Sequence, residues 1–400
     1  MIEPLTVQSS LLGFCPIKEA INKLAMESGK KERGAIYTKR EVVDFILDLS
    51  GYIACYSLIN CRLLEPSCGD GDFLLPAVDR LLESASLEST LSYEKLAPCI
   101  RAIELHQPTF EGTQKKIYQR LRKVGLSRDT AWHICDTWLH QDDFLLAEFS
   151  SSFTHIIGNP PYLRQEAVPD VLMREYRARY KTIYDRADIY VPFIERSLAL
   201  LAPRGKLGFI CADRWMKNKY GKKLRQLVSQ YYALTTYVDM CGVDAFHTEV
   251  SAYPAITIIE RGKFYKTRVF AHPVVDTEYL KFLAAELRSS DLPPKSEVRE
   301  IDNIAIGGEP WILDSFEDLA LVRRLEARFP VLENVACKVG IGVATGADKA
   351  FIDDFDCLDV ESSRKLPLVT TRDIVDGHIE WQGKGVINPF SDDGKLVNLD

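Results

Sequence analysis

The run Gly158-Asn159-Pro160-Pro161-Tyr162 carries the strongest chemical signal in the chain, and it directly follows the apolar residues Ile156 and Ile157. Two successive prolines fit neither a sheet interior nor a helix interior, so the run predicts a stiff loop at the end of a strand. Such a loop would aim the side-chain oxygen of Asn159 and the carbonyl of Pro160 at one point, beside the ring of Tyr162. Two acceptors suit an exocyclic amine, because holding its hydrogens draws the nitrogen towards a tetrahedral, more nucleophilic form.

A second set of residues places acidic side chains at predicted strand ends. Glu65 precedes a small-residue turn from Cys68 to Gly71, where glycine lets the backbone approach a ligand. Glu104 ends the next strand, and its carboxylate would accept both hydroxyls of a ribose while repelling a 2′-phosphate. After the third strand, Asp143 offers an acceptor to an adenine amino group and Phe144 a ring to stack on it. Three acidic strand ends favour a nucleoside site over a plain turn, and the GxGxxG motif typical of NAD binding is absent.

The elements that must position these residues alternate between short apolar runs and amphipathic stretches, as in a parallel sheet flanked by helices. We predict strands at Cys61–Leu64, Ile100–Glu104, Ile134–Leu139, Phe153–Ile157, Lys206–Cys211, Thr235–Met240 and Ala255–Glu260. We predict helices at Lys39–Leu49, Asp72–Glu83, Pro108–Lys123, Ile189–Leu201 and Gly221–Tyr231, the first of them with Thr38 as N-cap. The fold class is therefore α/β, with a doubly wound, seven-stranded, mostly parallel sheet.

The pattern weakens after Glu260, and this change sets the domain boundaries. We expect an N-terminal helical extension at 1–33, a catalytic domain at 34–265, a linker region at 266–310 that contains a proline-rich, charged stretch, and a β-rich module at 311–400. Ala336–Ile352 and Leu366–Val375 resume ordered, glycine-containing structure in that last module, which we expect to be incomplete.

Composition narrows the class of protein. The 400 residues are 46% hydrophobic and 27% charged, as in a globular protein, and two domains are expected for this length. No apolar run could span a bilayer and the N-terminus lacks a basic start, so we expect a cytoplasmic protein without a membrane partner. The ten cysteines form no CxxC pair, which predicts reduced thiols and no metal site. The formal net charge of −7 argues mildly against a non-specific polyanion binder but allows a local basic face.

From Gly34 to Glu260 the sequence resembles the amino-methyltransferases of the class I fold, especially DNA adenine-N6 methyltransferases like the TaqI and Eco57I enzymes. The family's N-terminal GxxYTP element corresponds to Gly34–Thr38, with Lys39 in place of proline. The order of donor pocket, NPPY and recognition domain is that of the gamma group. The later stretches Val339–Gly346, Lys349–Phe351 and Thr371–Ile374 resemble the start of a target recognition domain.

The resemblance implies S-adenosylmethionine as cofactor, with no metal. The catalytic residues it implies are Asn159, Pro160, Pro161 and Tyr162. The cofactor-binding residues it implies are Tyr37, Thr38, Glu65, Pro66, Cys68, Gly69, Gly71, Glu104, Leu105, Asp143, Phe144 and Asn159. It also implies that adenine is flipped out of the duplex and stacks on Tyr162, with Phe246 of the Asp244–Ala252 loop packing against the base.

The expected partner is double-stranded DNA, together with a restriction endonuclease or another subunit of a defence system. Basic residues on both sides of the site are candidates for phosphate contacts, with Arg164 and Lys217 as representatives. The full set is Arg164, Arg174, Arg177, Arg179, Lys181, Arg214, Lys217, Lys219, Lys222 and Lys223. A solvated helix face explains any single member equally well.

Four other interpretations stay open. Asn-Pro-Pro-Tyr also occurs in enzymes that methylate a protein glutamine amide and in RNA amino-methyltransferases, but these would end soon after the catalytic domain. About 140 residues follow Glu260 here. Cytosine-N4 methylation uses the same chemistry, more often with serine at the position of Asn159, and a non-catalytic donor-binding subunit would not need an intact Asn159 and Tyr162. An ordinary core aromatic is likewise an alternative for Phe246.

Overall fold

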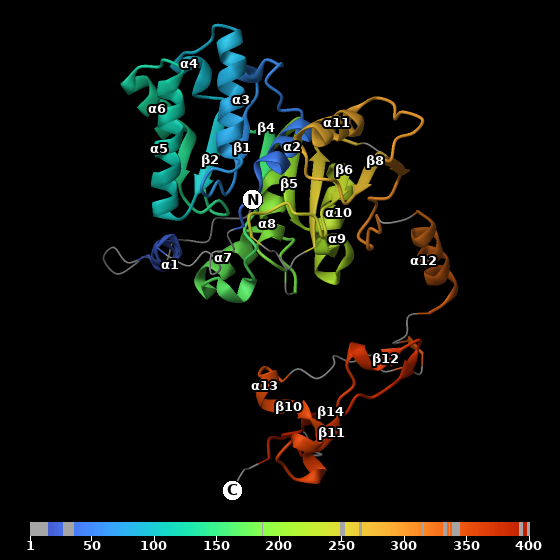
Figure 1. The fold of residues 1–400 in the computed structure, drawn as a ribbon. Coiled ribbons are helices and arrows are strands. Elements are labelled where there is room, and N and C mark those ends of the chain that lie inside the picture. Colours follow the sequence, from blue (N-terminus) through green and yellow to red (C-terminus); the bar gives the residue numbers. More distant parts are fainter. Residues whose placement is uncertain are drawn as a thin grey trace, which may run out of the picture. The chain divides into compact units, whose positions relative to one another are not determined.

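A computed structural model of the protein describes residues 15–26, 36–185, 187–248, 253–263, 266–313, 316–330, 334–335, 337, 345–391 and 395–397. The chain divides into two compact units, Met1–Val322 and Arg323–Asp400. The first unit carries a central sheet with helices on both faces (Figure 1).

The central sheet has nine strands in the order β3-β2-β1-β4-β5-β7-β6-β8-β9. Their bounds are β1 Leu63–Glu65, β2 Ile100–Glu104, β3 Leu139–Gln141, β4 Phe153–Gly158, β5 Leu201–Ala212, β6 Ala233–Asp239, β7 Pro254–Glu260, β8 Lys266–Ala271 and β9 Arg299–Asp302. The first five strands pair in parallel, and β7 runs antiparallel between β5 and β6. The carboxyl ends of β1, β2 and β4 therefore meet at one edge of the sheet.

Six of the seven predicted strands lie close to their predicted positions and the third begins later, while β8 and β9 make the sheet nine-stranded and not seven-stranded as predicted. The stretch Ile134–Trp138 belongs to helix α6, and the strand starts at Leu139. The buried residues Ala131, Ile134, Cys135 and Trp138 of this helix are three and four positions apart, so the apolar run was one face of a helix. The prediction of a strand at Ile134–Leu139 was wrong for that reason.

Helices form a layer on each face of the sheet. Their bounds in the first unit are α1 Pro16–Ala25, α2 Arg40–Ser50, α3 Leu74–Leu87, α4 Tyr93–Leu96, α5 Gln107–Lys123, α6 Arg128–Trp138, α7 Asp170–Arg179, α8 Tyr190–Leu200, α9 Arg214–Lys217, α10 Lys222–Tyr231 and α11 Thr277–Arg288. Helix α12, Phe316–Arg328, crosses the boundary between the units. None of the helices in the described part of the chain is both long and apolar enough to cross a membrane.

Neighbouring residues of a strand enter opposite cores, because side chains alternate across a sheet. Leu63 and Ile157 lie in the core under α2, α3, α5, α6 and α11. Leu64 and Ile156 lie in the core under α7, α8, α9 and α10. Burial on both faces explains why the strands read as continuous apolar runs.

The start of α2 differs from the prediction that Thr38 is its N-cap. Lys39 occupies the N-cap position and makes no side-chain capping bond. The backbone N–H of Thr38 donates to Asp72 Oδ2 at 3.1 Å, and its hydroxyl faces Asn159. Thr38 therefore serves the candidate site and not the helix.

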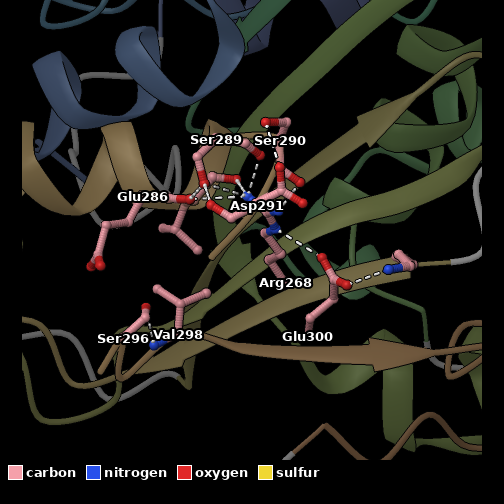
Figure 2. A network of polar contacts seen from close by, with 10 residues as sticks. Arg268, Glu286, Ser289, Ser290, Asp291, Ser296, Val298 and Glu300 are labelled. Carbon is pink, nitrogen blue, oxygen red and sulfur yellow. Dashed lines mark hydrogen bonds and ion pairs between the residues drawn. The ribbon is translucent and has the colours of Figure 1, made fainter. Parts of the chain in front are cut away.

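The region 266–310, expected as a linker, continues the sheet instead. It supplies β8, α11 and β9, and a buried arginine on β8 connects all three (Figure 2). Arg268 donates to the carbonyls of Glu286 and Ser289 at 2.9 and 2.6 Å, and it contacts Glu300 on β9 at 3.2 Å. A cation at the C-terminus of α11 satisfies carbonyls that lack intrahelical partners. The proline-rich stretch is thus a loop within the first unit.

The second unit, Arg323–Asp400, contains small antiparallel sheets. One sheet has the order β10-β14-β11 and the other pairs β12 with β13. The bounds are α13 Asp348–Phe351, β10 Ile352–Asp354, β11 Lys365–Pro367, β12 Ile374–Val375, β13 His378–Ile379 and β14 Lys384–Ile387. Most of the motif Val339–Gly346 lies outside the described residues.

Candidate active site

A partly enclosed cavity of about 180 Å³ lies at the carboxyl ends of β1, β2 and β4. Glu65 ends β1, Glu104 ends β2, and Asn159 follows the last residue of β4. All three residues line the cavity, together with the turn after β1. The topology therefore brings together the acidic strand ends and the proline-rich loop that the sequence keeps almost a hundred residues apart.

Backbone hydrogen bonds hold the turn after β1. The N–H of Cys68 donates to the carbonyl of Ile103 on β2 at 2.9 Å, and Thr113 Oγ1 on α5 donates to the carbonyl of Gly69 at 2.8 Å. Gly69 and Gly71 have φ angles of +52° and +93°, which glycine adopts at little cost. A Cβ on Gly71 would also lie 2.8 Å from Leu75 Cγ at the start of α3. These two positions explain why the turn is rich in glycine.

Glu104 is buried and joins this turn to β2. Its Oε2 accepts the N–H of Gly69 at 2.7 Å, and its Oε1 accepts the N–H of His106 at 2.8 Å. These two backbone donors fix the Glu104 carboxylate at the end of β2, beside the turn after β1.

Glu65 is 1% exposed, and its Oε2 has no hydrogen-bond partner among the described residues. Burial raises the pKa of Glu65 well above its usual value, and the nearby carboxylates of Asp72 and Glu104 raise it further. A buried carboxyl without a partner costs stability, so such a group is a candidate for binding a cationic ligand.

Asn159 has a fixed amide with one free end. Its Nδ2 donates to the carbonyl of Ile36 at 3.1 Å and to Thr38 Oγ1 at 3.3 Å. Its Oδ1 is buried and has no partner within the described chain. Because both donors of the amide are engaged by the segment before α2, the acceptor has a fixed direction at the cavity wall.

The segment before α2 is itself fixed by the loop after β6. Thr38 forms an antiparallel bridge with Phe246, and the flanking N–H groups of Lys39 and His247 donate to the carbonyls of Ala245 and Tyr37 at 2.9 and 3.0 Å. The side chain of Phe246 is 6% exposed and packs in the core beneath α2. It does not line the cavity, so in this structure Phe246 is a core aromatic. Glu249–Ala252 of the same loop lies outside the described residues.

Asp143 lies at the other end of the cavity, and both of its oxygens are engaged. Oδ1 accepts the N–H of Leu145 at 2.8 Å, and Oδ2 accepts the hydroxyl of Tyr176 on α7. Burial raises the pKa of Asp143, while the hydrogen bonds from Tyr176 and Leu145 lower it. Phe144, Leu145, Ile189 and Phe193 give this end an apolar lining.

Most of the residues nominated from the sequence line the cavity. These are Tyr37, Thr38, Glu65, Pro66, Cys68, Gly69, Glu104, Leu105, Asp143, Phe144, Asn159 and Pro161. Gly71 shapes the turn behind the wall, and Pro160 is buried. Tyr162 is half-buried against the core under α7 and α8, and its buried hydroxyl lacks a partner in the part of the chain that the structure describes.

Asp72 and Tyr176 also line the cavity but were not nominated from the sequence. Asp72 could have been found, because it extends the acidic pattern of the turn by one residue. Tyr176 lies in the polar helix α7, where no sequence pattern distinguishes it.

The basic residues named as candidate phosphate ligands are exposed, and several have acidic or aromatic neighbours. Lys217 Nζ lies 3.4 Å from Asp213 Oδ2, Arg214 stacks on the exposed Tyr253 at 4.9 Å from the ring centroid, and Arg164 is exposed. These contacts hold the side chains at the surface and leave their role towards DNA a prediction. Among the described residues, no group of histidines, cysteines and carboxylates could hold a metal ion, and every described cysteine is a free thiol.

Comparisons with known proteins connect this geometry to a family. The model of the Eco57I restriction-modification methylase family matches residues 82–246. The Type II methyltransferase M.PaeR7I of Pseudomonas aeruginosa is 53% identical over 388 residues, covering 96% of this chain and 68% of the relative. M.XhoI of Xanthomonas vasicola is 49% identical over 375 residues, covering 92% of this chain and 69% of the relative.

Solved structures share the fold at low sequence identity. The Type ISP restriction-modification enzyme LlaBIII, solved bound to DNA, gives a TM-score of 0.54 at 15% identity, covering 80% of this chain and 25% of that chain. The sequence relatives establish membership, since their identity is high over almost the whole of this chain. The chain belongs to the Type II restriction-modification DNA methyltransferases of the Eco57I type, a family that uses S-adenosylmethionine as methyl donor.

Proposed function

We propose that the protein transfers a methyl group from S-adenosylmethionine to N6 of adenine in double-stranded DNA, as the modification component of a restriction-modification system. The observation that carries this proposal is the buried Oδ1 of Asn159, which follows β4 beside the cavity and has no hydrogen-bond partner among the residues that the structure describes. An acceptor held in one direction suits a nucleophile that carries hydrogens, and the Pro160 carbonyl as a proposed second acceptor favours an amino group, which has two.

The residues of the cavity fit the methyl donor by charge and polarity. Glu65 and Asp72 lie near one end, where a carboxyl without a partner suits the ammonium of a methionine group. Glu104 lines the cavity with a carboxylate that two backbone N–H groups fix, and a carboxylate suits ribose hydroxyls as donors. Asp143 and Phe144, with an apolar lining, suit an adenine ring that carries one amino group. Glu65 and Glu104 end β1 and β2, and Asp143 follows β3, the next strand in the sheet; we propose that they face methionine, ribose and adenine in that order.

When bound, S-adenosylmethionine supplies an electrophilic methyl group. Asn159 Oδ1 would accept a hydrogen of the target amino group, and this bond strengthens as positive charge grows on the nitrogen. The backbone carbonyl of Pro160 would accept the second hydrogen, and the ring of Tyr162 would stack on the base. Alignment by these groups is the main contribution of the protein, and the proton leaves the product nitrogen without a dedicated base.

The target base must leave the duplex to reach Asn159, at a cost of a few kcal/mol. Exposed basic residues, including Arg164 and Lys217, would hold the flanking phosphates without reading sequence. The match to a family described as restriction-modification methylases supports a partnership with a restriction endonuclease.

The test compares Asn159→Ala with Asn159→Asp on duplex DNA, using labelled donor and nucleoside mass analysis. We expect N6-methyladenine from the wild type, a loss of at least about a hundredfold in turnover for the alanine variant, and partial activity for the aspartate variant, which keeps an acceptor. Donor binding should survive in both variants. Methylcytosine as the product, or near wild-type turnover of Asn159→Ala, would contradict the proposal.

A further inference from the structure

Helices α7 and α8 hold the loop that forms the proposed adenine end of the cavity. This loop, residues 142–147, follows β3 and carries Asp143 and Phe144. Tyr176 and Tyr180 are one helical turn apart and point to the same side of α7. Tyr176 donates to Asp143, and Tyr180 donates to the carbonyl of Leu145. Both rings are less than a tenth exposed.

Arg196 on α8 completes the support. Its guanidinium donates to the carbonyl of Leu145 at 2.7 Å and to the hydroxyl of Tyr180 at 2.5 Å, and it also bonds the carbonyl of Ala147. It lies over the ring of Phe144 at 5.3 Å from the centroid. Arg196 and Tyr180 therefore contact the backbone of the loop. Among the described side chains, Tyr176 is the one whose hydroxyl bonds the Asp143 carboxylate.

We infer that Tyr176 is a positioning residue for the methyl donor: its hydroxyl donates to Asp143 Oδ2 and orients this carboxylate to accept the amino group of the donor's adenine. The inference rests on the proposed function, in which Asp143 contacts that adenine. The inference gives α7 a role in cofactor binding. The sequence of α7 does not indicate this role, since the helix follows the Asn159 loop along the chain.

The charges around Asp143 make the role of Tyr176 measurable as a pH effect. Burial raises the pKa of Asp143, and Asp142 adds to the rise. The Tyr176 hydrogen bond lowers this pKa most, followed by the N–H of Leu145 and the charge of Arg196. Tyr180 also faces the carboxylate, but its hydroxyl bonds Leu145. Removing the Tyr176 hydroxyl therefore raises the pKa of Asp143 further, and a protonated carboxyl accepts a hydrogen bond more weakly.

The experiment measures binding of S-adenosylhomocysteine by calorimetry from pH 5.5 to 8.5, for the wild type, Tyr176→Phe and Tyr180→Phe. We expect Tyr176→Phe to bind on the order of tenfold more weakly at the acid end of this range, with the loss becoming smaller as the pH rises and Asp143 ionises. Tyr180→Phe removes an equivalent hydroxyl one turn away, and any weakening should not change with pH. In an Asp143→Asn background, Tyr176→Phe should have little further effect.

The alternatives have distinct outcomes. Wild-type affinity of Tyr176→Phe at every pH, or equal pH-independent weakening in both tyrosine variants, overturns the inference. If Tyr176→Phe does not fold, the affinity of Asp143→Asn for S-adenosylhomocysteine decides the question. Unchanged affinity in Asp143→Asn would show that Asp143 does not contact the donor, and Tyr176 could then not act through it. Failure of the wild type to bind S-adenosylhomocysteine at any pH would instead refute the proposed function.

Discussion

Replacing Glu65 with glutamine tests the methionine end of the proposed donor site. Glu65 is buried, one of its oxygens lacks a described partner, and burial together with Asp72 and Glu104 raises its pKa. Without a ligand, the carboxyl therefore holds its proton to a higher pH than a free glutamate. The ammonium of the donor would stabilise the ionised form, so binding should release up to one proton per donor near neutral pH.

The expected magnitudes follow from the loss of one hydrogen bond between charged groups. Such a bond contributes about 2 kcal/mol, so Glu65→Gln should weaken donor binding about thirtyfold. The same substitution should have the opposite effect on the stability of the ligand-free protein. A buried acid with a raised pKa lowers stability as the pH rises from its unfolded pKa towards its folded pKa, so the neutral glutamine variant should be at least as stable as the wild type at pH 8.

Calorimetry in phosphate and in Tris separates these effects, because the two buffers take up protons with different enthalpies. The wild type should show a buffer-dependent heat of binding and Glu65→Gln should not. Glu83→Gln, on the exposed face of α3, provides a matched control that should behave as the wild type. A buffer-independent heat for the wild type would refute the argument that Glu65 ionises on binding, and equal donor affinity in the variant would refute its contact with the donor.

Three further changes test the remaining parts of the structure. Tyr162→Phe removes a buried hydroxyl without a described partner and should keep kcat/KM for DNA within about threefold of the wild type. Tyr162→Ala removes the ring and should cost about 1–3 kcal/mol of transition-state stabilisation. Equal losses in the two variants would argue against stacking of the base on the ring. Arg268→Ala should lower the free energy of unfolding in urea by about 3 kcal/mol. The control Lys281→Ala, at an exposed position, should lower it by less than about 0.5 kcal/mol. A similarly small loss in both variants would show that the network in Figure 2 does not stabilise β8 and α11. Lys217→Ala should reduce the salt slope of DNA binding by about one without changing donor affinity, and an unchanged slope would remove Lys217 from the phosphate contacts.

The sequence predicts the part of the site that depends on strand ends. Glu65, Glu104 and Asn159 come together because parallel strands of one sheet end at the same edge, and the apolar runs that mark those strands are buried on both faces. The contacts of Tyr176 and Arg196 were not predictable in this way. They depend on how α7 and α8 lie against a loop about thirty to fifty residues earlier in the chain, and no periodic pattern encodes that packing.

The boundary of the first unit was missed for a related reason. The stretch between α11 and β9 has the charge and proline content of a linker. Arg268, which is buried on β8, nevertheless connects β8 with the end of α11 and with β9. The role predicted for Phe246 towards the base came from the resemblance of its loop, Asp244–Ala252, to a loop of the family, and it stays a prediction. The backbone pairing of Phe246 with Thr38 turns the ring into the core, and the sequence does not show which side of a paired residue faces inward.

The pairing of Thr38 with Phe246 also explains how the direction of Asn159 is set. The amide of Asn159 donates to Ile36 and Thr38, so its free oxygen is oriented only while the segment before α2 stays in place. That segment is held by Ala245 and His247 on one side and by Asp72, next to the donor turn, on the other. Thr38 therefore connects Asp72, on the proposed donor side, with Asn159 by hydrogen bonds. A donor that contacts Glu65 and Asp72 would stabilise the same hydrogen-bonded unit that orients the Asn159 oxygen for the target amine.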